Sequence, residues 1–196
     1  ATLIDLKSDL KAVIQKIHDE HPAAQLVLYG HSMGGLTALS YTTENDPSIA
    51  GVIASSPWIE LLNPPPLLLI KMASVAAKIF PSCCVRTGIK AKQLTLNGSG
   101  KSTKTDPLIH KKISIQLFTD MWNESRRIRQ NGFRPNVPIL LMFGSQDRLI
   151  SYQTGEQLAK GAIEYKLWDE TGHDLHLEIG NGRALQYIVK WIHDLL

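Results

Sequence analysis

Apolar and polar positions alternate along this chain with two different periods. Short apolar runs bounded by Gly, Pro or Asp predict four buried strands, and apolar residues recurring every third or fourth position predict helices between them. The strands are expected at 25–29, 49–54, 139–143 and 163–168, and the helices at 3–17, 36–43, 67–80, 114–130, 151–160 and 184–195.

Strands that alternate with helices favour an α/β fold, with a mostly parallel sheet and helices on both of its faces. The segment between the second and third strands departs from this order. It is largely helical, opens near Pro64–Pro66 and contains a Gly- and Ser-rich stretch at 97–105. We therefore expect three parts: core at 1–55, a helical cap insertion at 56–134, and core again at 135–196.

Composition limits the class of protein further. The 196 residues are 43% hydrophobic and 20% charged, which is typical of a folded globular domain and excludes a disordered tail. No apolar run reaches the ~20 residues that a membrane-spanning helix needs. Cys83 and Cys84 are adjacent and are the only cysteines, so no disulfide framework is predicted. No signal-peptide pattern is visible, and we expect a cytoplasmic protein.

Charge is distributed unevenly. The net charge is +3, but the segment 67–112 contains nine Lys or Arg and one acid, so it carries +8 and the remainder −5. Its basic residues are interleaved with aliphatic rather than aromatic side chains, which argues against nucleic-acid binding. Two interpretations stay open: peripheral contact of the cap with a lipid surface, or an ordinary solvated face of lysines.

The candidate nucleophile is Ser32. It lies in Gly30-His31-Ser32-Met33-Gly34, which follows the first strand and opens the next helix, as Gly-x-Ser-x-Gly requires. The tight turn implies that Gly30 and Gly34 must lack side chains. It also aims the backbone amide of Met33, at a helix N-terminus, toward the space above the serine, where an oxyanion would form.

A serine triad on this scaffold continues with an acid and then a histidine. Asp147 follows the third strand and His173 follows the fourth, so both fall at carboxyl ends of parallel strands. His173 would take the proton from Ser32, and Asp147 would orient the imidazole. His176 competes with His173 for the base role, although it lies further from the strand. Asp174 and Glu178 are expected to be exposed.

Other motifs do not change this picture. Gly98–Thr103 is similar to the end of a phosphate-binding loop, but position 95, where that motif requires its first glycine, is occupied by Thr95. No spacing of His, Asp or Glu indicates a metal site. We therefore expect no cofactor, no metal and no nucleic-acid partner.

Four segments together carry a family resemblance: Gly30–Gly35, Asp106-Pro107-Leu108, Gly144–Arg148 and His173–His176. In these segments the chain resembles the monoacylglycerol lipase and lysophospholipase branch of the α/β-hydrolases. The resemblance implies that Ser32, Asp147 and His173 form the triad and that the Met33 amide is one oxyanion donor. It also implies that the cap is a lid over an acyl-chain tunnel.

The family fold has about eight strands, of which four are predicted here. We therefore expect this chain to be the C-terminal part of a longer enzyme, with the earlier strands and the second oxyanion donor lying upstream.

The expected reaction is hydrolysis of single-chain lipid esters, monoacylglycerols first, through an acyl-enzyme. A lysophospholipase, a general carboxylesterase, a serine aminopeptidase-like hydrolase and a non-catalytic lipid- or partner-binding fragment remain as alternatives. The oligomeric state is not predicted.

Overall fold

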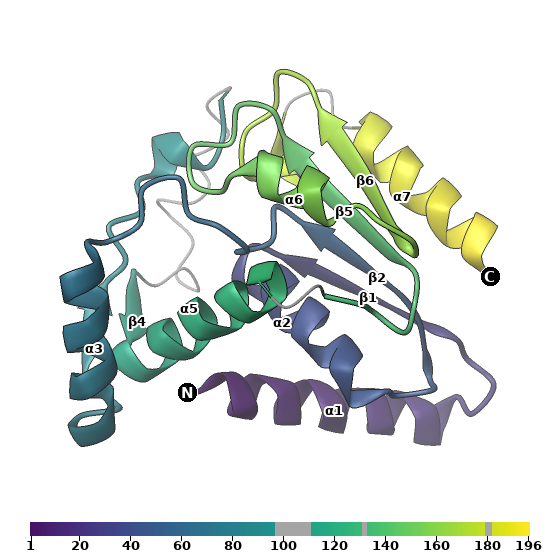
Figure 1. The fold of residues 1–196 in the computed structure, drawn as a ribbon. Helices are drawn as coiled ribbons and strands as arrows, with labels where there is room; N and C mark the ends of the chain where they lie inside the picture. Colours follow the sequence, from purple (N-terminus) through teal and green to yellow (C-terminus); the bar gives the residue numbers. More distant parts are fainter. Residues whose placement is uncertain (97–110, 131–132, 179–181) are drawn as a thin grey trace.

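The central feature of the computed structural model, which describes residues 1–96, 111–130, 133–178 and 182–196, is a four-stranded parallel sheet (Figure 1). Its strands are β1 (Leu26–His31), β2 (Ile49–Ser55), β5 (Ile139–Gly144) and β6 (Ile163–Trp168), in that spatial order. All four predicted strands are therefore confirmed, and so is the mostly parallel α/β architecture.

Helices cover both faces of this sheet. In Figure 1, α1 (Leu3–Glu20), α2 (Met33–Tyr41) and α6 (Tyr152–Leu158) lie on one side, and α7 (Gly182–Leu195) lies on the other. Neighbouring strand residues face opposite layers: Val52 and Ala54 belong to the larger buried cluster, and Ile53 to the smaller one beneath α7. This alternation is the ordinary consequence of a pleated strand.

The helices differ from the sequence prediction by one to three residues at their ends. Helix α2 begins at Met33 rather than at 36, because Ser32 is its N-cap residue and the turn after β1 leads directly into the helix. Helix α6 ends at Leu158, slightly before the predicted 160. Helix α1 begins where Thr2 and Asp5 form a reciprocal capping box, which satisfies backbone N–H groups at its first turn.

The chain between β2 and β5 contains α3 (Leu67–Ile79), β3 (Cys84–Arg86), β4 (Lys112–Ser114) and α5 (Ile115–Gln130). Strands β3 and β4 form a small antiparallel ladder that was not predicted, because three residues are too few to show a period of two. The predicted helix start at Asp106-Pro107 and the polar stretch 97–105 lie outside the described residues.

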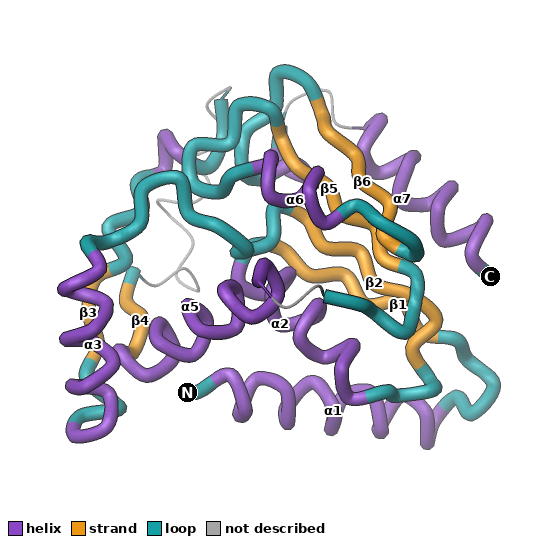
Figure 2. The backbone as a smooth tube through the Cα atoms, viewed as in Figure 1, coloured by secondary structure: helices purple, strands orange, loops and turns teal. Residues whose placement is uncertain are grey.

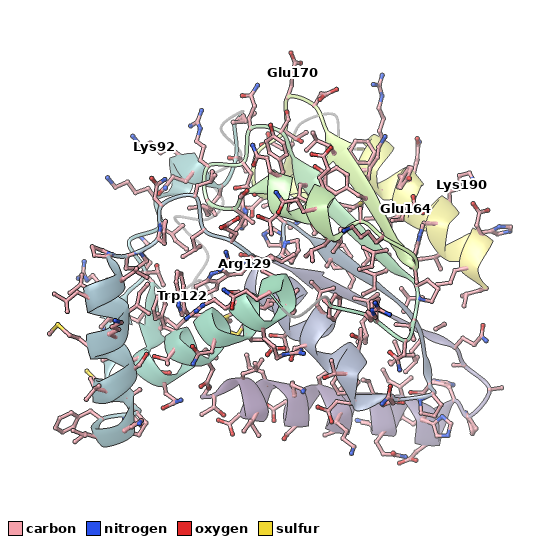
Figure 3. All side chains as sticks on the ribbon, in the orientation of Figure 1. Lys92, Trp122, Arg129, Glu164, Glu170 and Lys190 are labelled. Atoms are coloured by element: carbon pink, nitrogen blue, oxygen red, sulfur yellow. The ribbon has the colours of Figure 1, made fainter. Side chains whose placement is uncertain are left out.

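Helix α5 joins this segment to the core, since it packs against both α3 and α2. Arg129 at its C-terminal end donates to Glu60 Oε1 at 2.8 Å, which ties α5 to the chain just after β2 (Figure 3). Helix α3 lies further out, beside β3 and β4 (Figure 2). None of the helices in the described ranges combines the length and apolarity that crossing a bilayer requires.

Candidate active site

Ser32 occupies a strained turn between β1 and α2. Its backbone has φ 52° and ψ −114°, a conformation that residues other than glycine rarely adopt. Two backbone bonds hold it there: its N–H donates to Ser55 O at 2.9 Å, and its carbonyl accepts from Trp58 N at 2.9 Å. Strain of this kind is expected at a nucleophile elbow, where the hydroxyl must stand clear of the sheet.

The elbow depends on glycines, though not on the two that the motif suggests. A Cβ on Gly30 would stand 2.4 Å from Gly34 O, so this position admits no side chain. A Cβ on Gly34 would meet nothing within 4 Å, so the expectation that Gly34 must lack a side chain is wrong. The second restricted position is Gly35, whose Cβ would lie 2.9 Å from Pro57 Cβ.

Asp147 and His173 meet at the carboxyl edge of the sheet. Asp147 Oδ2 lies 2.8 Å from His173 Nδ1, and both residues are buried, with 7% and 1% of their surface exposed. The other carboxylate oxygen, Oδ1, accepts from the N–H groups of Leu149 (2.8 Å) and Ile150 (3.0 Å). The carboxylate is thus fixed by its own loop while it orients the imidazole.

The imidazole that pairs with Asp147 is His173 and not His176. His176 lies in the 3₁₀ turn Leu175–Leu177, is exposed, and faces the ring of His31 at a centroid distance of 5.2 Å. Partial burial and the neighbouring His31 lower the pKa of His176. In the described part of the chain the Ser32 hydroxyl makes no hydrogen bond to His173; in apo enzymes such bonds are often long and tighten when substrate binds.

A second Asp–His pair adjoins the first, and it was missed in the sequence. His31 Nε2 lies 2.9 Å from Asp174 Oδ1, and the rings of His31 and His173 are 4.7 Å apart. Asp174 and Glu178 are 7% and 5% exposed, so the expectation that both would be exposed is wrong. Because His31 and Asp174 are far apart in the sequence, no local pattern could have paired them.

His31, His173 and Asp174 are also the residues that could approach a metal ion, since their potential ligand atoms lie within 4.8 Å of one another. In the structure these groups already have carboxylate or imidazole partners: His173 Nδ1 pairs with Asp147, and His31 Nε2 pairs with Asp174. We assign them to this hydrogen-bonded cluster.

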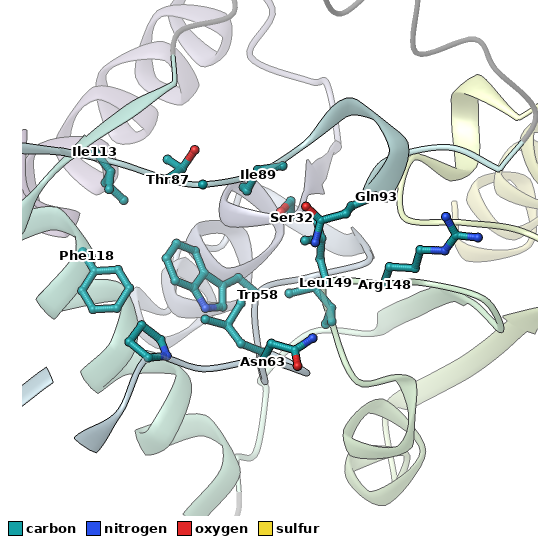
Figure 4. Close-up of a pocket in the computed structure, with 14 residues that line it drawn as sticks. Ser32, Trp58, Asn63, Thr87, Ile89, Gln93, Ile113, Phe118, Arg148 and Leu149 are labelled. Atoms are coloured by element: carbon teal, nitrogen blue, oxygen red, sulfur yellow. The ribbon is translucent and has the colours of Figure 1, made fainter. Parts of the chain in front are cut away.

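Ser32 opens onto a cavity of about 270 Å³. Most side chains around it are apolar and come from the segment after β2, from the cap segment and from the loop after β5 (Figure 4). The apolar lining includes Trp58, Leu61, Ile89, Ile113, Phe118, Leu149 and Ile150. Polar groups are fewer: Asn63, Thr87, Gln93 and Arg148. A lining of this kind suits a mainly apolar ligand.

Comparison with known families agrees with this geometry. The family model described as "Serine aminopeptidase, S33" matches residues 2–180. The chain belongs to this family. Within it, the chain lies in the monoacylglycerol lipase-like branch of the α/β-hydrolases, as the resemblance implied.

Three similar proteins illustrate that branch. A monoglyceride lipase of Rattus norvegicus is 28% identical over 193 residues, covering 94% of this chain. The phospholipase YtpA of Bacillus subtilis is 28% identical over 163 residues, covering 77% of this chain. The crystal structure of a Paleococcus ferrophilus monoacylglycerol lipase superposes with a TM-score of 0.89 at 23% identity, covering all of this chain and 77% of that chain.

The chain spans less than two-thirds of the length of most of the curated relatives it matches. It covers 63% of the rat protein and 61% of the Bacillus protein. It covers 48% and 19% of two further relatives, from Schizosaccharomyces pombe and Dictyostelium discoideum.

Proposed function

We propose that this chain carries the serine-hydrolase site of an enzyme that cleaves carboxylic esters of single-chain lipids, with monoacylglycerols as the favoured substrates. The observation that carries the proposal is the buried Asp147–His173 pair at the same sheet edge as the strained Ser32, which lines an apolar cavity. The named lipases and phospholipase in the same family support the choice of substrate class.

In the proposed first half-reaction, Ser32 Oγ attacks the ester carbonyl carbon while His173 Nε2 takes the hydroxyl proton. Asp147 keeps the proton on Nδ1, so that Nε2 is free to act as a base, and it stabilises the imidazolium that forms. The carbonyl oxygen becomes an oxyanion, for which the Met33 amide, among the unpaired N–H groups at the start of α2, is a donor.

The tetrahedral intermediate then collapses. His173 returns its proton to the leaving alcohol, glycerol in the favoured case, and an acyl-Ser32 ester remains. In the second half-reaction, His173 deprotonates a water molecule, which attacks that ester. The bond from the acyl carbon to Ser32 Oγ breaks, His173 returns the proton to Ser32 Oγ, and the fatty acid is released. The chemistry as proposed needs no cofactor, because each proton moves between Ser32, His173, water and the alcohol.

The apolar lining of the cavity favours acyl esters over aminoacyl amides. A serine aminopeptidase-like activity, a lysophospholipase and a small-ester carboxylesterase keep the same triad and differ in what the cavity accepts. An enzyme that binds an acyl chain gains up to about 0.8 kcal/mol for each CH₂ that becomes buried. We therefore expect kcat/KM to rise with acyl length across an ester series, and aminoacyl amides to be turned over poorly.

The exposed side chains of the cap favour a lipid surface as the place where the protein meets its substrate. Helix α3 buries only Ile70 and Ala77, while most of its other apolar side chains are exposed, among them Leu68 (69%), Val75 (62%) and Ile79 (66%). Lys71 and Lys78 on the same helix are exposed and would face anionic headgroups. We propose peripheral contact of α3 with a bilayer, with the charged headgroups beside its lysines.

The decisive experiment is covalent labelling of the intact protein by a fluorophosphonate, followed by intact-mass spectrometry. One adduct on the wild type, absent from Ser32→Ala and His173→Ala, would support the proposed roles. Ser55→Ala is the matched control, because the Ser55 hydroxyl is buried at the end of the adjacent strand and has no hydrogen-bond partner in the described part of the chain. It should label like the wild type. A folded wild type that takes no adduct would favour the alternative of a non-catalytic lipid- or partner-binding fragment.

A further inference from the structure

A buried carboxylate that takes no part in the proposed chemistry lies where the cap meets the His173 loop. Glu178 is 5% exposed, and its Oε1 accepts two backbone N–H bonds. One comes from Gly172, immediately before His173, at 3.0 Å. The other comes from Leu96, 82 residues earlier in the chain, at 2.8 Å. A single oxygen therefore joins two segments that lie far apart in the sequence.

Leu96 ends a stretch that we call the cap arm, residues 87–96. The first part of this arm lines the cavity, through Thr87, Ile89 and Gln93. Figure 4 shows Gln93 beside Ser32, with Ile89 and Thr87 further along the same wall. The position of the arm thus sets one side of the space in which an acyl chain would lie.

The far part of the arm is held by the loops that carry the acid and the base. Arg148 Nη1, next to Asp147, donates to Lys92 O at 3.0 Å. The N–H of Asp174, next to His173, donates to Leu94 O at 2.9 Å. Glu178 adds the third connection, and it is the one that also holds the His173 loop through Gly172.

The space around Gly172 is matched to this contact. A Cβ on Gly172 would stand 2.7 Å from Glu178 Oε1 and 3.1 Å from Leu94 O. Only glycine lets the loop approach both the carboxylate and the arm. Among the described residues, the second carboxylate oxygen, Oε2, is buried with no hydrogen-bond partner, and the two described bonds that offset the cost of burying this acid are those to Oε1.

We propose that Glu178 is a positioning residue that fastens the cap arm to the His173 loop, so that the cavity wall and the base move as one unit. This inference rests on the proposed function for its kinetic consequences. Its structural consequence, protection of the Leu96 and Gly172 amides, does not depend on any activity.

The test compares Glu178→Ala with Glu178→Gln in the intact protein, because a Gln carbonyl can accept the same two N–H bonds. With a short-chain and a long-chain ester, Glu178→Ala should lower kcat about tenfold for both, since the base loop loses its support. It should raise KM about threefold for the long-chain ester alone, since only that ester uses the far cavity wall. Glu178→Gln should stay within about threefold of the wild type for both constants.

Asp46→Ala is the matched control. Asp46 also accepts a backbone N–H, from Ser48 at 3.0 Å, and the Tyr41 hydroxyl at 2.8 Å, but it lies at the opposite end of the strands, before β2. Loss of the Asp46 side chain should reduce the stability of the protein, but it should not lower kcat or raise KM for the long-chain ester alone. By hydrogen–deuterium exchange, Leu96 and Gly172 should exchange about tenfold faster in Glu178→Ala, and not in Asp46→Ala.

Wild-type kinetics and unchanged exchange at Leu96 and Gly172 in Glu178→Ala would overturn the proposal. So would Glu178→Gln as defective as Glu178→Ala, because the negative charge rather than the two bonds would then matter. If the wild type hydrolyses neither ester, the proposed function fails, and exchange at the two amides alone decides whether Glu178 fastens the arm.

Discussion

Gly144, at the end of β5, lies directly against Gly172 in the loop that precedes His173. A Cβ on Gly144 would stand 2.2 Å from Gly172 O and 2.4 Å from Thr171 O. The loop that carries Asp147 begins at Gly144, so this contact brings the acid and the base within hydrogen-bond distance. Gln146 N adds a bond to Thr171 O at 2.9 Å between the same two loops.

We therefore expect Gly144→Ala to damage both stability and activity. The added methyl group cannot fit without separating the two loops, and overpacking of this kind costs about 1–3 kcal/mol. Urea unfolding and the rate of fluorophosphonate labelling measure the two effects. Gly182→Ala is the control, because a Cβ there would meet no described atom within 4 Å. Equal stability of the two variants would contradict the argument.

Replacing Asp147 by Asn tests the orientation of the imidazole. The Asn carbonyl can still accept from Leu149 and Ile150, so the loop should keep its shape. The amide would, however, donate to His173 Nδ1 and leave the proton on Nε2, the wrong tautomer for a base. We expect kcat to fall by about 10³–10⁴-fold with little change in the midpoint of thermal unfolding.

The control for this variant is Asp120→Asn, because Asp120 on α5 likewise accepts two hydrogen bonds, from Leu3 N and Gln116 Nε2, and pairs with neither Asp147 nor His173. It should retain full activity. If Asp147→Asn kept more than a tenth of the wild-type kcat, His173 would not depend on Asp147 for its orientation.

The exposed face of α3 can be tested with vesicles. Replacing Leu68 and Val75 together by Ser removes two apolar side chains that each gain about 1.5–3 kcal/mol when fully buried. Because α3 would insert only partly, the two side chains should contribute a part of this burial free energy to membrane binding. We therefore expect the variant to co-sediment at least tenfold more weakly with vesicles of mixed zwitterionic and anionic lipid. Binding should also weaken as salt increases, because Lys71 and Lys78 contribute by charge.

Val189→Ser on α7 is the matched control for the vesicle experiment. Val189 is 66% exposed, like the α3 positions, but α7 lies far from α3, with the main sheet between them (Figure 1). It should leave vesicle binding unchanged. Undiminished binding of the α3 variant would assign the apolar face a different role.

The free energy of unfolding should fall at acid pH, partly because Glu124 on α5 becomes protonated. Burial of this carboxyl opposes ionisation, but hydrogen bonds from Arg127 Nε (2.9 Å) and Nη2 (2.7 Å) outweigh it and hold the pKa of Glu124 below its ordinary value. Because the pKa is lower in the folded state, the stabilisation is fully present above the unfolded value. It is lost as the pH falls through the folded one.

We therefore expect the free energy of unfolding of the wild type to exceed that of Glu124→Gln by a constant amount above about pH 5. The difference should shrink as the pH falls toward about 3. Urea unfolding of both proteins at several pH values measures it. A difference that stays constant down to the lowest pH would show that the Arg127 contact does not shift this titration.

Much of the fold could be predicted from local patterns. Each strand of the main sheet is an apolar run whose period and boundaries are properties of a few consecutive residues, and all four were found within two residues of their ends. The parallel order then placed Ser32, Asp147 and His173 at one edge, because parallel strands share the direction of their carboxyl ends. The Asp147–His173 pairing followed from that topology.

Other features depended on tertiary contacts alone. Asp174 and Glu178 read as surface acids, since charged residues in a polar loop are usually solvated. They are buried because the cap arm packs onto the His173 loop and because His31, at the end of β1, pairs with Asp174. The ladder of β3 and β4 forms from two segments of three residues whose pairing no local period reveals. The sequence by itself determined the strands, the turn at Ser32, and the order in which Asp147 and His173 follow it at the strand ends. The tertiary structure decided which polar groups are buried together, because burial depends on segments that meet only when the chain is folded.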